Sequence, residues 1–116
     1  MRRRRLGSSG PEISVIGLGA WEAGGGEYGA GPADDEIVAA YQAGFDAGID
    51  WIDTAAAYGN GASETVIGDW LAKLPQSRRP RVSTKFNIDT SAGDFAGQVD
   101  RSVRDSLARL QLKSLP

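Results

Sequence analysis

Strand-like runs alternate with segments of helical periodicity along most of this 116-residue chain. The runs are Val15–Trp21, Trp51–Ala55 and Arg81–Lys85, and apolar residues at helical spacing follow each of them. Strands that alternate with helices in this way require crossover connections and a parallel sheet. The sequence therefore predicts the α/β class, either as a doubly wound sheet or as part of a closed barrel.

This alternation divides the chain into a leading hairpin and three β/α units, which we expect to form one domain over residues 1–116. Two short alternating segments around the turn residues Ser8–Gly10 predict the hairpin at residues 3–15. The expected β/α units span residues 15–48, 50–74 and 81–110.

Each expected helix carries a start or stop signal. Acids at Asp34–Glu36 favour the N-terminus of the first helix, and Gly48 supplies its C-terminal stop. Ser63 is expected to cap the second helix, and either Ser91 or Asp94 the third. The expected helical faces contain Ile37, Tyr41, Gly44, Phe45 and Gly48, then Val66, Ile67, Trp70, Leu71 and Leu74, and finally Phe95, Val99, Val103, Ser106, Leu107 and Leu110.

Histidine and cysteine are both absent from the chain. Zinc sites of the usual kind and Ser-His-Asp or Cys-His nucleophiles are therefore excluded within it, and we expect no metal site. The net charge is −2, and the basic run Arg2–Arg5 is interpreted as a solvated strand, not as a nucleic-acid surface. No apolar run is typical of a membrane span or an export signal, so we expect a cytoplasmic protein.

Residues able to carry chemistry lie at or just past the carboxyl ends of the expected strands. Gly19 closes the first strand, Asp53 lies in the second with Tyr58 five residues later, and Lys85 closes the third. In either architecture these strand ends share one face. An unpaired carboxylate in a run such as WIDTA, buried on both faces, would be costly to desolvate. Asp53 therefore needs a partner, and Lys85 is the candidate.

Two interpretations of these residues stay open on spacing alone. If Asp53 and Lys85 meet, an ammonium beside Tyr58 favours the anionic form of the phenol and makes it a usable proton donor near neutral pH. In the structural alternative, Asp53 caps a turn, Tyr58 packs over the sheet and Lys85 is solvated.

A glycine-rich segment invites a nucleotide-binding interpretation. Gly24–Gly29 formally fits G-x-G-x-x-G, but it stands apart from the strand end at Trp21, and Pro32 precedes the helix. The phosphate-binding mechanism needs strand, tight turn and helix in immediate succession, so a Rossmann site is not supported. Trp21 itself can line a pocket, stack on a ring or simply cover the end of the sheet.

Three segments carry a resemblance to a known family: RRLGSSGPEISVIGLGAW, DAGIDWIDTAAAYGNGASE and RVSTK. In this order they resemble the N-terminal portion of the aldo-keto reductases, and the D-T-A-x-x-Y-G element at Asp53–Gly59 is the most specific part. The resemblance covers nearly the whole chain. It implies the first three β/α units of a (β/α)8 TIM barrel, preceded by a hairpin that plugs the barrel bottom.

By this resemblance the protein is an oxidoreductase that reduces aldehyde, ketone or sugar carbonyls with NADPH, or with NADH. Tyr58 is then the general acid, and Lys85, held by Asp53, assists it. The resemblance assigns cofactor binding to Gly19, Ala20, Trp21 and Asp53.

The family's catalytic histidine lies on the fourth strand and has no counterpart in this sequence. The alternative is therefore a catalytically incompetent module, either truncated or regulatory. The expected partner is a small-molecule carbonyl substrate, with neither nucleic acid nor membrane. Open sheet edges would also permit self-association.

Overall fold

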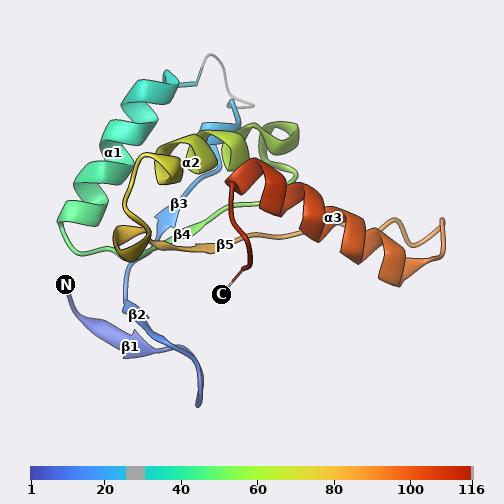
Figure 1. The fold of residues 1–116 in the computed structure, drawn as a ribbon, viewed down its shortest axis with the longest axis horizontal. Helices are drawn as coiled ribbons and strands as arrows, with labels where there is room; N and C mark the ends of the chain where they lie inside the picture. Colours follow the sequence, from blue (N-terminus) through green and yellow to red (C-terminus); the bar gives the residue numbers. More distant parts are fainter. Residues whose placement is uncertain (26–30, 116) are drawn as a thin grey trace.

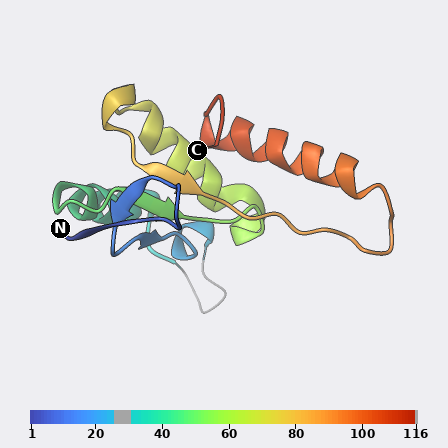
Figure 2. The ribbon, with the colours of Figure 1, turned by 90° about the horizontal axis from the view of Figure 1, so that it is seen from below.

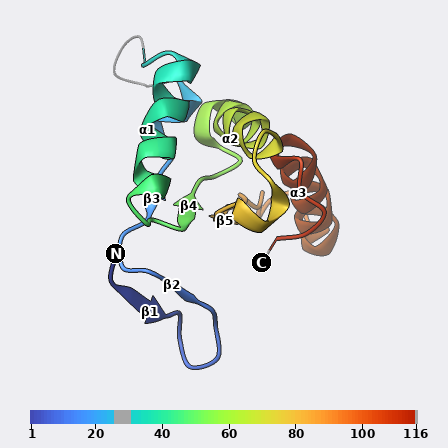
Figure 3. The same ribbon diagram turned by 60° about the vertical axis from the view of Figure 1, so that its left-hand side comes forward.

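The computed structural model describes residues 1–25 and 31–115, and its elements follow the expected order (Figure 1). A two-stranded antiparallel hairpin precedes a three-stranded parallel sheet. The α-helices of the described residues lie along one side of the parallel sheet, and the hairpin lies beyond one end of it (Figure 3). The α/β class and the leading hairpin are therefore confirmed.

The parallel sheet has the order β3-β4-β5. Its strands are Leu18–Gly19 (β3), Trp51–Asp53 (β4) and Arg81–Ser83 (β5), each shorter than the run that predicted it. Asp53 lies level with Gly19 on one side and with Ser83 on the other. This register brings the carboxyl ends of the strands to one edge, as a parallel sheet requires.

Strand β4 is covered on one face only, so the expectation that it is buried on both faces is wrong. Ile52 is completely buried, whereas Trp51 and Asp53 are partly exposed. Successive side chains of a strand point to opposite faces, and only the face toward the helices is closed. Asp53 therefore lies on the more open face of the sheet.

The helices are α1 (Asp34–Asp46), α2 (Ala62–Ala72) and α3 (Phe95–Leu110), with 3-10 turns at Glu22–Gly24, Tyr58–Gly61 and Gln76–Arg78. None of the helices in residues 1–25 and 31–115 is long and apolar enough to cross a membrane. The carboxylate of Asp94 accepts a hydrogen bond from the Gly97 amide at 3.2 Å, which confirms one of the two expected caps for α3.

Two sequence-based expectations about the helices are wrong. Ser63 does not cap α2. The helix begins at Ala62, and Gly61 at φ 92° precedes it, so Ser63 lies within the first turn, where it is buried. Phe95 is 51% exposed and not part of a buried face. The N-terminal half of α3 extends beyond the sheet, which leaves this residue without a covering layer (Figure 2).

The hydrophobic core lies between the sheet and the helices. Ile52 of β4, Ile67 and Leu71 of α2, and Leu110 of α3 are completely buried in it. Gly68 permits the close approach of α2 and α3, because a Cβ there would lie 2.1 Å from the Arg109 carbonyl oxygen. The helices thus pack against the face of the sheet opposite Asp53.

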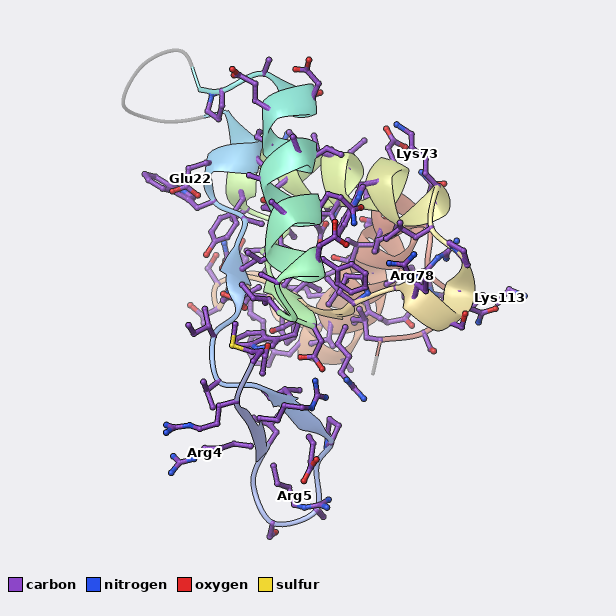
Figure 4. All side chains as sticks on the ribbon, turned by 90° about the vertical axis from the view of Figure 1, so that its left-hand side faces the viewer. Arg4, Arg5, Glu22, Lys73, Arg78 and Lys113 are labelled. Carbon is purple, nitrogen blue, oxygen red and sulfur yellow. The ribbon has the colours of Figure 1, made fainter. Side chains whose placement is uncertain are left out.

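The Asp50 carboxylate contacts both strands of the hairpin and helps to join it to the parallel sheet. The hairpin strands are Arg3–Arg5 (β1) and Glu12–Ser14 (β2), and the Arg4 and Arg5 side chains point away from the helices (Figure 4). Asp50 accepts a hydrogen bond from the Ser14 amide at 2.8 Å. It also forms an ion pair with Arg3 of β1 at 2.6 Å. The arginine run is therefore an exposed strand, as expected, with one member tied to the domain.

The pKa of Asp50 reflects these contacts. Burial alone would raise it, but the Ser14 hydrogen bonds and the Arg3 guanidinium outweigh burial and hold the pKa below its usual value. A lowered folded-state pKa gives a stabilisation that is complete above the unfolded pKa of about 3.9 and is lost as the pH falls through the folded value.

We predict that Asp50→Asn weakens this connection. The change removes the charge from hydrogen bonds that are worth about 1.5–3 kcal/mol to a charged group, so the free energy of unfolding should fall by about that amount at pH 7. The difference between the variant and the wild type should shrink below pH 4. Urea unfolding at several pH values measures both effects. Asp105→Asn, on the exposed side of α3, is the control, and an equal loss in both variants would contradict the assignment.

Strands β3 and β5 form the two edges of the parallel sheet. Beyond β5 the chain leaves the sheet (Figure 2). Phe86 and Ile88 of this segment are 44% and 39% exposed. Unpaired strand edges next to exposed apolar side chains are templates for association with another chain.

We therefore predict that residues 1–116, produced alone, self-associate. Ile88→Lys should shift the population toward the monomer, because a charge in the exposed apolar segment beyond β5 opposes association. Ser8→Lys, in the exposed hairpin turn, is the control: it adds the same charge without removing an apolar side chain and should have little effect. Sedimentation velocity over a range of concentrations measures the distribution, and a wild-type chain that stays monomeric throughout would refute the prediction.

Candidate active site

The ends of the parallel strands gather three chemically active side chains. Asp53 is the last residue of β4, and Lys85 lies two residues beyond the end of β5. Tyr58 begins the 3-10 turn that leads into α2. Because β4 and β5 are parallel and in register, Asp53 and Lys85 lie at the same end of the sheet, where the strands have their carboxyl ends. The fold therefore brings together residues that are 32 positions apart in the sequence.

The Lys85 ammonium is the centre of this group. Its Nζ atom donates to Asp53 Oδ2 at 2.7 Å, to the Thr54 carbonyl at 2.9 Å and to the Tyr58 hydroxyl at 3.5 Å. An ammonium has three N–H donors, so three acceptors match its full capacity. The Nζ atom also lies 5.2 Å from the centre of the Tyr58 ring.

The environment of Lys85 keeps it protonated. Burial alone would lower the pKa of Lys85, but the hydrogen bond and negative charge of Asp53 outweigh burial and raise the pKa above its usual value, with a smaller contribution from Tyr58. Asp53 is itself oriented by the Ser83 hydroxyl, which donates to Oδ1 at 3.1 Å. The site thus holds a fixed positive charge beside a phenol.

The expected meeting of Asp53, Tyr58 and Lys85 is confirmed, because the Lys85 ammonium contacts both other side chains and is not merely solvated. The reason given for the pairing needs correction. The Asp53 and Lys85 side chains are 37% and 49% exposed, so burial of the carboxylate does not force the contact. The register of β4 with β5 and the third acceptor at Thr54 account for it better. The catalytic roles of the three residues stay predictions.

A second group of expected residues follows β3. Gly19 ends the strand, Ala20 is buried, and Trp21 is 38% exposed where the 3-10 turn begins. The Ala20 amide donates to the Asp53 carbonyl at 3.0 Å, which extends the pairing of β3 with β4. A Cβ at Gly19 would have no atom within 4 Å, so the strand end is open beside the lysine cluster. The loop is adjacent to the site through Asp53.

The glycine-rich segment starts next to Tyr58. A Cβ on Gly24 would lie 2.6 Å from the Gly59 backbone, and a Cβ on Gly59 would collide with the Gly24 carbonyl. Gly59 also has φ 58°, which glycine adopts readily. These glycines serve backbone packing between the two loops. Residues 26–29 of the G-x-G-x-x-G pattern lie outside the described residues.

The sequence analysis missed the buried polar side chains between the site and helix α2. Ser63 and Thr54 are completely buried and bonded to each other at 2.8 Å. Glu64 is also completely buried and accepts hydrogen bonds from Thr84 at 2.6 Å and Arg109 at 2.7 Å. Polar residues on the apolar side of α2 were the available signal, because a buried polar group requires a partner.

Comparison with known proteins adds a family match. Residues 15–115 match the model of the aldo/keto reductase family. The chain is 33% identical over 96% of its length to aldo-keto reductase YhdN of Bacillus subtilis (strain 168), and 37% identical over 94% to L-galactose dehydrogenase of Arabidopsis thaliana. It covers 35% and 34% of those proteins, so it spans about a third of the length of these curated relatives.

Solved structures match the fold over nearly the whole chain. The glycerol dehydrogenase AKR11B4 from Gluconobacter oxydans superposes with a TM-score of 0.75 at 33% identity, covering 97% of this chain and 36% of that one. An aldo-keto reductase from Klebsiella pneumoniae in complex with NADPH superposes with a TM-score of 0.74 at 31% identity, covering 99% and 38%. Solved relatives of this type are (β/α)8 barrels, which confirms the expected fold class, the N-terminal part of such a barrel preceded by a hairpin.

Proposed function

Because this chain belongs to the aldo/keto reductase family, we propose that the protein is an NADPH-dependent oxidoreductase that reduces the carbonyl group of an aldehyde, a ketone or a sugar. Relatives crystallised with NADP and NADPH support the cofactor, although NADH would supply the same chemistry. Relatives named for L-galactose and glycerol support a small polyhydroxylated substrate. The cysteine-free composition suits the reducing cytoplasm, where we place the protein.

The observation that carries the proposal is the contact of the Lys85 ammonium with Asp53 and Tyr58. In the proposed reaction the Tyr58 hydroxyl donates its proton to the carbonyl oxygen of the substrate. The Lys85 charge stabilises the negative charge that the phenol oxygen gains as the proton leaves. Asp53 holds the charged ammonium in place and raises the pKa of Lys85 further above the neutral range, in which a lysine is already protonated.

The residues around the strand ends fit the nicotinamide end of the cofactor. The open space at Gly19 leaves room for a flat ring, and the partly exposed Asp53 carboxylate can accept a hydrogen bond from a hydroxyl or amide group. We assign Gly19, Ala20, Trp21 and Asp53 to holding it. When bound, the reduced nicotinamide supplies the hydride that reaches the carbonyl carbon.

The rival interpretation is a truncated or regulatory module with no turnover. Relatives named as reductases and dehydrogenases favour an enzyme over such a module. A titration with NADPH separates the two, because a module without a cofactor role would not bind it at physiological concentrations. Besides NADPH, the proposed reaction requires only a small-molecule carbonyl substrate.

We predict that Tyr58→Phe reduces turnover about 10²- to 10⁴-fold, the usual contribution of a positioned proton donor, and leaves NADPH affinity nearly unchanged. The substitution removes a hydroxyl and little volume. Steady-state NADPH oxidation and a cofactor fluorescence titration, on the protein expressed from its complete gene, measure the two quantities.

Tyr41→Phe is the matched control for Tyr58→Phe. Tyr41 packs against Trp70 with ring centres 6.0 Å apart, and burial, together with the charge of Glu22, raises its pKa to about 12. Its phenol is therefore no proton donor near neutral pH, and its loss should leave turnover intact. Equal losses of binding and turnover in Tyr58→Phe would show that Tyr58 has a structural role instead.

A further inference from the structure

Two buried hydroxyl groups connect the two halves of the candidate site. The Ser63 hydroxyl donates to the Ala20 carbonyl at 2.6 Å, and it lies 2.8 Å from the Thr54 hydroxyl. Thr54 and Ser63 are both 0% exposed, and Ala20 is 1% exposed. A serine hydroxyl has one proton to donate, and in Ser63 it forms the hydrogen bond to the Ala20 carbonyl. Thr54 must then donate to Ser63, so the hydrogen bonds run in one direction, from Thr54 through Ser63 to Ala20.

Both ends of this chain of hydrogen bonds touch the site. At one end, the Thr54 carbonyl accepts from the Lys85 ammonium at 2.9 Å. At the other end, the Ala20 carbonyl belongs to the peptide bond that leads into Trp21. Helix α2 contributes Ser63, so the link passes beneath the sheet through an element that carries neither the lysine nor the loop.

We propose that Thr54 and Ser63 are positioning residues, which hold the Gly19–Trp21 loop in a fixed place relative to Lys85. The proposal rests on the function proposed above, because it gives the loop to the nicotinamide and the lysine to the proton donor. Hydride and proton must reach adjacent atoms of one carbonyl group. A loop that moves by about 1 Å would therefore impair the reaction without removing any reacting group.

The hydroxyl groups act through other residues and not on the substrate themselves. Neither is exposed, and their hydrogen bonds go to each other and to the Ala20 carbonyl. Removing the Ser63 hydroxyl leaves the buried Thr54 hydroxyl without its acceptor, and the local backbone must shift to relieve it. The Lys85 to Asp53 contact does not pass through either hydroxyl, so the proton donor should keep its charge environment.

The first test needs no cofactor. Hydrogen exchange of the Ala20 amide, which donates to the Asp53 carbonyl, reports whether the loop stays paired with β4. In the protein expressed from its complete gene, Ser63→Ala and Thr54→Val should lower the protection of this amide about tenfold relative to the Leu71 amide of the core. Thr54→Ser keeps a hydroxyl and should recover most of the protection.

Thr65→Ala is the matched control on the same turn of α2. Its hydroxyl donates to the Gly61 carbonyl at 3.0 Å and does not reach the loop. This variant should weaken α2 without a selective effect on the Ala20 amide. If Ser63→Ala and Thr65→Ala change the Ala20 and Leu71 amides alike, the positioning role is wrong.

The second test measures the consequence for the reaction. Ser63→Ala should raise the Kd for NADPH about tenfold, as expected when about 1.4 kcal/mol of binding free energy is lost. The shape of the kcat/KM pH profile should stay unchanged, because Lys85, Asp53 and Tyr58 are all present. Thr65→Ala should bind NADPH as the wild type does.

The outcomes of the two tests separate the two proposals. Wild-type protein that binds no NADPH would overturn the proposed function, and the positioning role would fall with it. Normal binding in the wild type, together with an unchanged Kd in Ser63→Ala, would overturn the positioning role alone. A loss of Ala20 protection with a raised Kd, both restored by Thr54→Ser relative to Thr54→Val, would support both.

Discussion

The structure of the site depends on one ammonium group with three acceptors. Lys85 reaches the Asp53 carboxylate, the Thr54 carbonyl and the Tyr58 hydroxyl at the same time. This is possible because β4 and β5 are parallel and in register, so that the chain leaves both strands at the same end of the sheet. A shift of one residue in this register would point Asp53 to the opposite face of the sheet. The pairing of two short strands therefore decides whether Asp53 and Lys85 can meet.

The elements below the sheet hold that register. Helix α2 lies against β4 through its apolar residues, and it also sends Ser63 and Glu64 into buried polar contacts. Glu64 receives hydrogen bonds from Thr84, next to Lys85, and from Arg109 of α3. These contacts favour the observed packing, because separating Glu64 from its partners would leave a buried carboxylate unpaired. The polar groups on α2 thus align the helix with the strand ends.

The sequence was sufficient to predict the order of elements, because strand and helix periodicities differ and acids and glycines mark the helix ends. It also predicted the meeting of Asp53 with Lys85, since both follow parallel strands. It could not predict the role of Ser63, because a serine that caps a helix and a serine buried in the first turn occupy nearly the same position. The Glu64 to Arg109 pair joins residues 45 positions apart and has no local signal. The partial exposure of Asp53 depends on which face of the sheet is covered, and alternation within a three-residue strand does not reveal that.

The central claim is that Asp53 raises the pKa of Lys85 and holds its ammonium beside the phenol. The most direct test is an NMR titration of the Lys85 side chain in the wild type and in Asp53→Asn. The account predicts a pKa above the ordinary lysine value in the wild type. In the variant the pKa should fall, because burial then acts on the ammonium without the opposing carboxylate. Identical titration curves for the two proteins would contradict the account.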